Sequence, residues 1–565
     1  MNGRDLVGSV KLVGSRRGLR AVGSAWRRAR EDARALPGRG PERARVPGPV
    51  TGAEPGPGGG VVRFARSELR IRVAVGGAVF WGWDGAEPGH SSALEGEAPA
   101  ADSRVVLEPG TDGGWQVVAE RLTVTVSRHG AVELRTPGGV VLRRELPPRW
   151  WEPVAGGDAR WVQRSEVPAD ARFFGLGGPA AGPRLRDGVY ALGNTVPGGR
   201  SGPVDGPPYP TMPVQLVVAD AGTHLVFYDN CRPGRVSLRE GQEGAGSGHD
   251  RRGASEVRVD GGPLRCWAVA GTPARVLAGW SSLTGAAPAP AWARGVRGGR
   301  GPAATGWPGL RASLARVLGL GLCGVPYSGS DVGGFDGSPS PELYLRWLQL
   351  GAYLPLFRTH AAIDAGRREP WESGAEVLAA AREVLLERER LRPYWVTLER
   401  LAALTGAPCV RPLWWAWPGD RALRDCEDAF LLGDALLVAP VLEPGVVRRA
   451  VRLPPGRWYD TVSGAVYQGP GRVVVEAPLS RVPVLARAGA VIPVRGAGGG
   501  PELEVWAPVA GRPGGGTVVR EAGDGRAPVE VERYTSRLED GRVVVERDGG
   551  AVNCPVRVRG AHDQR

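Results

Sequence analysis

The sequence predicts a multidomain protein of the β plus α/β class, with an N-terminal β-sandwich, a central α/β segment and further β domains at the C-terminal end. Three observations support this prediction. Apolar and polar residues alternate from Val61 to about Thr272, short apolar runs and helical patterns take turns over 276–418, and the alternation returns after Gly419. A chain of 565 residues holds several domains of about 100–200 residues each.

Residues 1–60 are rich in arginine, glycine and proline, and we expect them to form a flexible tail. Met1 to Arg45 holds twelve basic and four acidic residues, so it carries +8 of the net charge of +13. A basic tail without a recognition motif is weak evidence for nucleic-acid binding, so we predict no nucleic-acid partner. No signal-peptide pattern and no run of about 18 apolar residues occurs, so no membrane association is predicted either.

The six cysteines are scattered along the chain: Cys231, Cys266, Cys323, Cys409, Cys426 and Cys554. They form no CxxC pair and no cluster with histidine, which argues against a zinc site. We therefore predict neither a metal nor a cofactor. Reduced and mostly buried thiols are typical of a cytoplasmic protein, which is the location we expect.

Residues 61–275 are predicted to fold as a large β-sandwich. Apolar and polar residues alternate in the stretch RLTVTVSRHGAVELRTPGGVVLRREL, where His129-Gly130 and Pro137-Gly138 mark turns. This is the pattern of antiparallel hairpins, and strands at this spacing are typical of a sandwich.

Two successive strand ends are predicted to present polar side chains in the segment 276–418. The apolar run Leu318 to Tyr327 ends in a glycine-rich turn that holds Asp331, and Leu354 to Phe357 predicts the next buried strand, which ends at Arg358 and His360. In a barrel of parallel strands, polar residues at the C-terminal ends of strands face the ligand site.

Helices are predicted around these strands. Ser340 as the cap and Pro341 at the first helical position indicate where one helix begins. The stretch EVLAAAREVLLERERLRPYWVTLERLAALTG predicts two more helices, with Pro393 near their junction. For the tryptophans that follow, core packing is favoured over sugar stacking: Trp414, Trp415 and Trp417.

Several stretches together resemble glycoside hydrolase family 31, the α-glucosidase and α-xylosidase family. The stretches are GVPYSGSDVGGF, SPELYLRWLQLGAYLPLFRTH, REPW, RPLWWAWPGD, FLLGDALLVAPVLEPG, LPPGRWYD and PLSRVPVLARAGAVIP. Upstream, FFGLGG and YPTMPVQLV resemble the N-terminal domain of that family. The resemblance implies a (β/α)8 barrel between β domains, the hydrolysis of O-glycosyl bonds in carbohydrate metabolism, and an α-linked oligosaccharide or α-glucoside as the ligand.

The resemblance also implies that the barrel is partial. About 125 residues separate Trp292 from Pro418, which is room for about four strand–helix units, whereas a full barrel needs about 250 residues. We expect a truncated barrel at 276–418, with parallel strand edges left uncovered. A proximal C-terminal β-sandwich at 419–495 and a distal β domain at 496–565 complete the expected organisation.

Both carboxyl groups that a retaining glycosidase needs are absent from their family positions. The family's acid/base position falls on Pro302, which has no proton to give, and the motif of the nucleophile is missing. A rim motif that carries an aspartate in the family is Asn194-Thr195-Val196 here. No catalytic residue is therefore predicted, and the resemblance implies substrate-binding roles for Asp331, Phe335, Arg358, His360 and Arg297.

Some alternatives remain open at this point. Asp331 could act with a second acid in a rebuilt site, drawn from Asp336, Asp364, Glu369 and Glu372. His360 could be structural, and Phe335 could pack in the core or form an apolar wall for a sugar ring. For the whole chain we consider a hydrolase of the α-glucosidase type, a noncatalytic carbohydrate-binding relic, and the product of a truncated or mis-joined gene.

Overall fold

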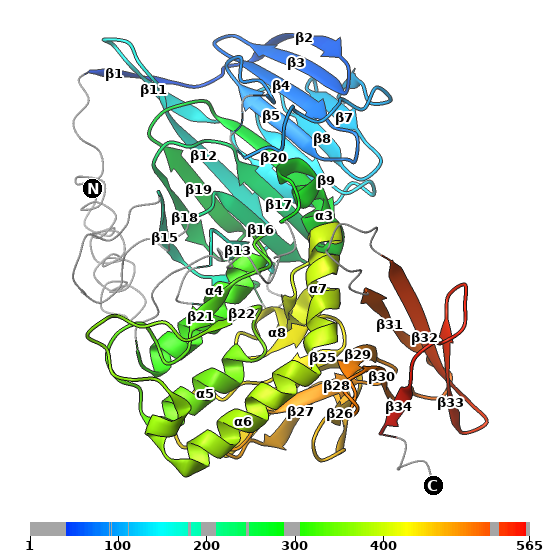
Figure 1. The fold of residues 1–565 in the computed structure, drawn as a ribbon. Helices are drawn as coiled ribbons and strands as arrows, with labels where there is room; N and C mark the ends of the chain where they lie inside the picture. The colour runs from blue at the N-terminus through cyan, green and yellow to red at the C-terminus, as the bar shows by residue number, and fades with distance from the viewer. Residues whose placement is uncertain are drawn as a thin grey trace.

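The computed structural model describes residues 41–89, 91, 93–110, 112–178, 182–193, 211–244, 248–287, 305–519 and 530–560. Figure 1 shows a β-rich N-terminal part stacked on a layer of helices, with the C-terminal sheets packed beside the helices. This arrangement confirms the predicted multidomain β plus α/β class. Among the described helices, none combines the length and the apolar character needed to cross a membrane.

One sheet of the N-terminal sandwich is antiparallel. Its strands are β1 (Glu42–Arg45), β6 (Leu107–Pro109), β7 (Trp115–Val118), β8 (Thr123–Val126), β9 (Val132–Arg135), β10 (Val141–Glu145), β11 (Arg149–Pro153), β12 (Arg160–Val167), β15 (Gly188–Leu192), β18 (Gly234–Arg239) and β19 (Gly253–Val259). They lie in the order β15-β18-β19-β12-β10-β9-β8-β7-β6, and β11 joins β1 to β12.

The facing sheet is antiparallel as well. Its strands are β2 (Val50–Gly56), β3 (Gly59–Phe64), β4 (Glu68–Val73), β5 (Val79–Trp83), β13 (Arg172–Gly175), β14 (Arg184–Leu185), β16 (Val214–Ala219), β17 (Gly222–Tyr228) and β20 (Arg265–Gly271). They lie in the order β14-β13-β16-β17-β20-β5-β4-β3-β2. Side chains from both sheets share one apolar core, which the alternating pattern of the sequence predicts.

The predicted tail is wrong from Glu42 onward. Strand β1 pairs with β11, and β2 pairs with β3, so residues 42–56 are part of the sandwich. Ion pairs join these strands to the body of the sandwich, such as Arg45 to Glu152 at 3.0 Å. The arginine and proline content that suggested a tail belongs here to strands at the edge of a sheet, where both residue types are tolerated.

A polar network lies inside the sandwich. Arg143 of β10 is fully buried and donates to Glu145 and Gln215 at 2.6 Å each, and to Ser165 and Tyr228. The network spans both sheets, because Gln215 and Tyr228 come from the facing one. A buried guanidinium is tolerated when its donors find acceptors, as they do here.

His224 of β17 lies near this network without taking part in it. Its side chain is fully buried, and neither ring nitrogen has a hydrogen-bond partner among the described residues. Burial, and secondarily the nearby charge of Arg143, holds the pKa of His224 well below its ordinary value. The imidazole is therefore neutral in the folded protein.

The central segment carries the helices and a short parallel sheet. Its elements are α3 (Pro273–Thr284), α4 (Trp307–Gly321), β21 (Gly329–Asp331), α5 (Pro341–Gly351), β22 (Leu356–Arg358), η1 (Pro370–Ser373), α6 (Ala375–Arg390) and α7 (Arg392–Thr405). Helix α5 begins as predicted, because the Ser340 side chain accepts from the Leu343 backbone N–H and Pro341 follows. Helices α6 and α7 confirm the predicted pair, and Pro393 lies near their junction as the second residue of α7.

The strand predicted over Leu318 to Tyr327 is wrong. Residues up to Gly321 form the last turn of α4, and the strand begins only at Gly329. The buried residues Leu310, Leu314, Val317 and Leu318 recur with a helical spacing, and this longer pattern prevails over the local apolar run.

The C-terminal part contains three sheets among the described residues. Its elements are β23 (Val410–Pro412), η2 (Leu413–Trp415), α8 (Arg421–Arg424), β24 (Phe430–Leu432), β25 (Leu436–Val438), β26 (Arg448–Asp460), β27 (Val466–Glu476), β28 (Val484–Arg487), β29 (Val491–Arg495), β30 (Pro501–Trp506), β31 (Gly514–Val519), β32 (Val531–Glu539), β33 (Arg542–Arg547) and β34 (Val556–Arg559). The sheet orders are β23-β24-β25-β28-β26-β27, β29-β30-β34 and β31-β32-β33. Strand β29 belongs to the predicted proximal domain and β30 to the predicted distal domain, and the two strands pair. The boundary predicted at residue 495 therefore falls inside one sheet.

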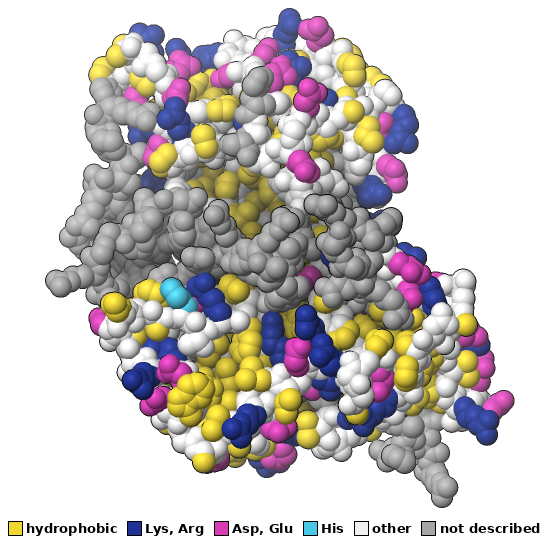
Figure 2. All heavy atoms as spheres, viewed as in Figure 1, with side chains coloured by type: hydrophobic (Ala, Val, Ile, Leu, Met, Phe, Trp, Pro, Cys, Tyr) yellow, Lys and Arg dark blue, Asp and Glu magenta, His cyan; other side chains and the backbone are white. Residues whose placement is uncertain are grey.

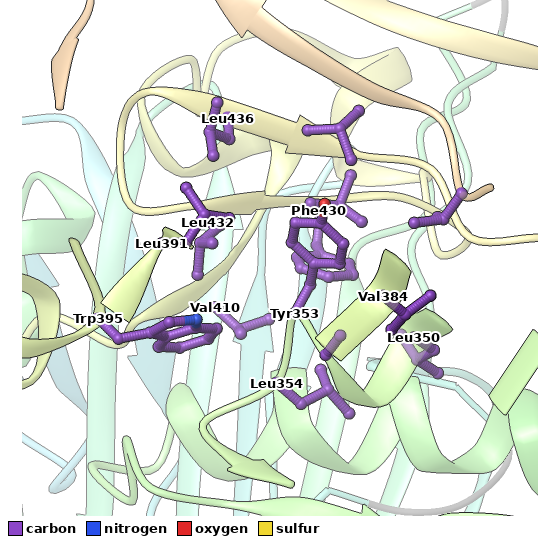
Figure 3. Packing of buried hydrophobic residues seen from close by; sticks show 14 of the residues in the cluster. Leu350, Tyr353, Leu354, Val384, Leu391, Trp395, Val410, Phe430, Leu432 and Leu436 are labelled. Carbon is purple, nitrogen blue, oxygen red and sulfur yellow. The ribbon is translucent and has the colours of Figure 1, made fainter. Parts of the chain in front are cut away.

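One apolar core joins the helices to the C-terminal sheet. Figure 3 shows Leu350 of α5, Val384 of α6 and Trp395 of α7 in the same cluster as Phe430 and Leu432 of β24. The same core continues into Leu436 and Val438 of β25 and Val484 and Ala486 of β28. The helical layer is therefore packed on one side against the C-terminal sheet.

Arg346 of α5 reinforces this contact. Its side chain is 1% exposed and donates to the backbone carbonyls of Val446, Ala477, Pro478 and Arg481 at 2.9–3.1 Å. These carbonyls belong to the C-terminal part of the chain, so a single guanidinium ties helix α5 to it.

We predict that His224→Leu makes the free energy of unfolding less dependent on pH in weak acid. Below the ordinary pKa of about 6.5, the unfolded chain binds a proton on His224 that the folded protein does not bind. The free energy of unfolding therefore falls as the pH drops below that value. The loss amounts to about 1.4 kcal/mol per pH unit until the folded-state pKa is reached. Urea unfolding at several pH values between about 7.5 and 5 measures the slope; parallel curves for variant and wild type would contradict the prediction.

Candidate active site

Strands β21 and β22 pair in parallel and place two charged side chains opposite each other. The register pairs Gly329 with Leu356, Ser330 with Phe357, and Asp331 with Arg358. Arg358 donates from Nε to Asp331 Oδ1 at 2.7 Å. Asp331 is only 5% exposed, and a buried carboxylate needs such a partner to offset the loss of hydration. The predicted adjacency of Asp331 and Arg358 is therefore confirmed, although Asp331 lies in a strand that begins only at Gly329.

His360 and Phe335 complete the group. His360 follows β22, its side chain is 53% exposed, and its Nδ1 lies 3.8 Å from Asp331 Oδ2. The ring of Phe335 lies beside the imidazole, with 5.5 Å between ring centroids. Four of the five predicted binding residues thus lie together, and their role toward a substrate stays a prediction. Arg297 lies outside the described residues, as do Pro302 and the stretch 194–196.

The other acids of this segment do not join Asp331 in a buried group. Asp336 is exposed and accepts through Oδ1 from the Thr305 backbone N–H at 2.9 Å. Glu372 pairs with Arg367 at 3.0 Å, and Asp364 and Glu369 are exposed. The ionic partners that the structure gives Asp331 are Arg358 and His360, so both of its oxygens face basic side chains.

Arg368 is a buried residue of this region to which the sequence pattern assigned no role. Its side chain donates to the backbone carbonyls of Gly334 at 3.1 Å, Asp336 at 2.8 Å and Gly337 at 3.1 Å. Burial lowers its pKa from the ordinary value, while Asp336 and Asp331 oppose that effect. The only sequence signal was its place in the stretch REPW, because backbone acceptors leave no pattern of side-chain types.

A groove of about 580 Å³ adjoins the group. Its walls come from α5, β22, the segment that follows β22, and α6, and they include Tyr344, Leu348, Phe357, His360 and Leu385. Neither Asp331 nor Phe335 lines it. Figure 2 shows hydrophobic side chains gathered on this face over α5 and α6. Leu385 of α6, which lines the groove, is exposed.

The chemistry offered by the four residues is hydrogen bonding beside an aromatic ring. Imidazole, guanidinium and carboxylate groups donate to and accept from hydroxyls, and an aromatic face covers apolar C–H surface. Among the described residues, no cluster of three or more histidine, cysteine, aspartate or glutamate side chains could hold a metal ion. The arrangement therefore suits a neutral polyhydroxylated ligand.

The tryptophans after β23 do not contribute to the group. Trp414 and Trp415 are buried in the core between the second N-terminal sheet, α3 and the C-terminal sheet. Phe174 packs against Trp414 with 4.8 Å between ring centroids. The preference for core packing is confirmed for these two residues.

Comparisons with known proteins place the central and C-terminal parts of the chain. A family model described as the glycosyl hydrolases family 31 TIM-barrel domain matches residues 299–398, and one described as the glycosyl hydrolase family 31 C-terminal domain matches residues 406–492. A probable glucan 1,3-alpha-glucosidase of Arabidopsis thaliana is 44% identical over 188 residues, which are 33% of this chain and 20% of the relative. Neutral alpha-glucosidase AB of Homo sapiens is 43% identical over 190 residues, again 33% and 20%. The chain thus spans about a fifth of the length of these curated relatives.

Solved structures share the fold at low sequence identity. One chain from the crystal structure of ER glucosidase II, a complex of the catalytic subunit and the binding domain of the regulatory subunit, aligns with a TM-score of 0.77 at 14% identity, over 94% of this chain and 90% of that chain. A dextranase of Flavobacterium johnsoniae in complex with isomaltotriose aligns with a TM-score of 0.75 at 16% identity, over 89% and 90%. The likeness extends to the N-terminal sandwich, which the family models do not match.

We predict that Asp331→Asn lowers the free energy of unfolding by about 2 kcal/mol, because it leaves the partly buried Arg358 without its charged partner. Urea unfolding of variant and wild type measures the difference. Asp364→Asn, the same change at an exposed site of the same segment, is the matched control and should stay within about 0.5 kcal/mol. Equal losses in the two variants would show that the ion pair does not support the strand ends.

Proposed function

The part of the chain from residue 299 to residue 492 belongs to glycosyl hydrolase family 31, and on this premise we propose that the protein is an α-glucosidase-type glycoside hydrolase by descent that binds α-linked glucosides at the ends of β21 and β22. We propose further that this polypeptide holds the sugar without cleaving its glycosidic bond.

The observation that carries the proposal is the grouping of Asp331, Arg358, His360 and Phe335 at two adjacent strand ends. Strand ends of this kind face the ligand in barrels. The ion pair fixes the Arg358 guanidinium and the Asp331 carboxylate, which leaves the exposed imidazole of His360 free to turn toward a hydroxyl. A preorganised set of donors and acceptors lowers the ordering cost of binding.

The names of the relatives support an α-linked glucoside as the ligand. One curated relative is named for a glucan 1,3-α-glucosidase activity, and one structural relative is a dextranase bound to isomaltotriose. Glucosidase II has also been solved with a bound α3-linked glucose disaccharide. What these proteins share is glucose in an α-linkage, so we assign this class and no single linkage.

The proposal that the bond is not cleaved rests on the carboxyl groups. Retention of configuration requires two carboxyls about 5–5.5 Å apart, one of them protonated and one nucleophilic. Asp331 faces Arg358 and His360, while Asp336, Asp364, Glu369 and Glu372 are exposed. Loss of general acid catalysis alone costs about 10²–10⁴-fold in rate, and loss of the nucleophile removes the covalent route.

An alternative concerns the gene rather than the site. The barrel model matches only 100 residues, from 299 to 398, and the chain spans about a fifth of its curated relatives. A truncated or mis-joined gene, whose longer product is the active enzyme, fits these observations. Genomic DNA around the codons for Ala293 to Arg300 would contain the remaining barrel-coding stretch in that case.

We predict that purified protein binds an aryl α-glucoside in calorimetry and shows no hydrolysis above a blank. His360→Ala should weaken binding by about tenfold, the value of one lost hydrogen bond to a hydroxyl. His129→Ala, the same change at an exposed turn of the N-terminal sandwich, is the control and should leave the affinity unchanged. Turnover that Asp331→Asn abolishes would overturn the noncatalytic reading, and absence of binding would overturn the proposed site.

A further inference from the structure

We propose that Arg368 is the positioning residue of this site: it locks the loop 333–337, which carries Phe335, against the segment that carries His360. The inference rests on the proposed function for its effect on sugar binding. The geometry that supports it is independent of any ligand.

The guanidinium of Arg368 connects two loops. On the first loop, which follows β21, it donates to the carbonyls of Gly334, Asp336 and Gly337. On its own loop, which follows β22, it donates to the carbonyl of Gly366. One buried side chain thus donates to backbone oxygens of both loops, and it also contacts the Thr305 hydroxyl at 3.5 Å.

Backbone hydrogen bonds join the same two loops at two points. Ala362 donates to the carbonyl of Phe335 at 2.7 Å, and Gly366 donates to the carbonyl of Gly337 at 3.1 Å. The acceptor of the first of these bonds is the backbone carbonyl of Phe335 itself. The distance between the rings of Phe335 and His360 therefore depends on how the loops are held.

The first loop cannot set its own shape. Gly333, Gly334 and Gly337 have φ values of 85°, 87° and 59°, in the left-handed region that glycine enters without strain. Glycines at these positions make the loop possible and also leave it many other conformations. Hydrogen bonds from outside the loop help to select one conformation. Arg368 supplies three of them, and Thr305 supplies others, to Gly333 and Asp336.

Lysine cannot replace Arg368 in this role. A planar guanidinium presents five N–H donors in a fixed fork, whereas an ammonium offers three donors from one point. The acceptors here are spread over four carbonyls on two loops, so an ammonium at the end of a flexible stem reaches only some of them. A guanidinium is also more weakly hydrated, which suits a position that is 5% exposed.

The experiment is a double-mutant cycle on aryl α-glucoside affinity, measured by calorimetry. Arg368→Gln and Arg368→Lys should each weaken binding by about tenfold or more, and Phe335→Leu should do the same. If Arg368 acts through Phe335, the double variant Arg368→Gln/Phe335→Leu binds about as weakly as either single variant. Losses that multiply instead would overturn the proposal, because Arg368 would then act elsewhere.

A second readout needs no ligand. The ring of Phe335 shifts the proton NMR resonance of the His360 imidazole by its ring current, and His360→Ala identifies that resonance among the six histidines of the chain. We expect Arg368→Gln, Arg368→Lys and Phe335→Leu to move the resonance in the same direction. Arg448→Gln, at an exposed arginine of β26 that pairs with Glu476, is the control and should leave it in place.

The two readouts separate the possible failures. A wild-type protein that binds no glucoside, with a His360 resonance that moves as expected, would overturn the proposed function and leave Arg368 as the positioning residue. An unmoved resonance in Arg368→Gln would overturn the inference whatever the affinity. Should Arg368→Gln fail to fold, the cycle is completed with Arg368→Lys and Phe335→Leu. Lysine keeps a positive charge at position 368, and leucine keeps an apolar side chain at position 335.

Discussion

The parallel pairing of two three-residue strands, β21 and β22, is the constraint on which the site depends. A parallel sheet is stable only where both faces are covered, and here helices α4 and α5 pack against these strands. The Trp347 indole of α5 donates to the Ser330 hydroxyl at 2.9 Å, which fixes which side of β21 faces the helix. With Ser330 turned to the helix, the alternation of a strand turns its neighbour Asp331 to the other face, where Arg358 meets it.

Much of this arrangement could be predicted from the sequence. The cap at Ser340, the strand that ends at Arg358 and the adjacency of Asp331, Arg358 and His360 follow from local rules on helix starts and on parallel strands. The strand predicted over Leu318 to Tyr327 failed because a short apolar run fits a helix end as well as a strand. The spacing of apolar residues over the length of a whole helix decides between a helix and a strand. A window of ten residues is too short to show that spacing.

Other features could not be predicted, because their partners are distant in the chain or belong to the backbone. Arg368 contacts carbonyl oxygens, which every residue type provides, so no pattern of side-chain types predicts these contacts. The buried network around Arg143 gathers residues from positions 145, 165, 215 and 228, and only the stacking of two sheets brings them together. In both cases an arginine that composition alone would place on the surface is an interior residue.

A third buried arginine, Arg346, couples the folding of two parts of the chain. Arg346 of α5 donates to four carbonyls of the segment 446–481, so separating the helix from that segment would break four hydrogen bonds at once. The apolar core shared by α5, α6, α7 and β24 adds to this coupling. The helical layer and the C-terminal sheet are therefore one folding unit, although the sequence divides them into an α/β and a β domain. A boundary drawn between them for recombinant expression would cut through a single cooperative structure.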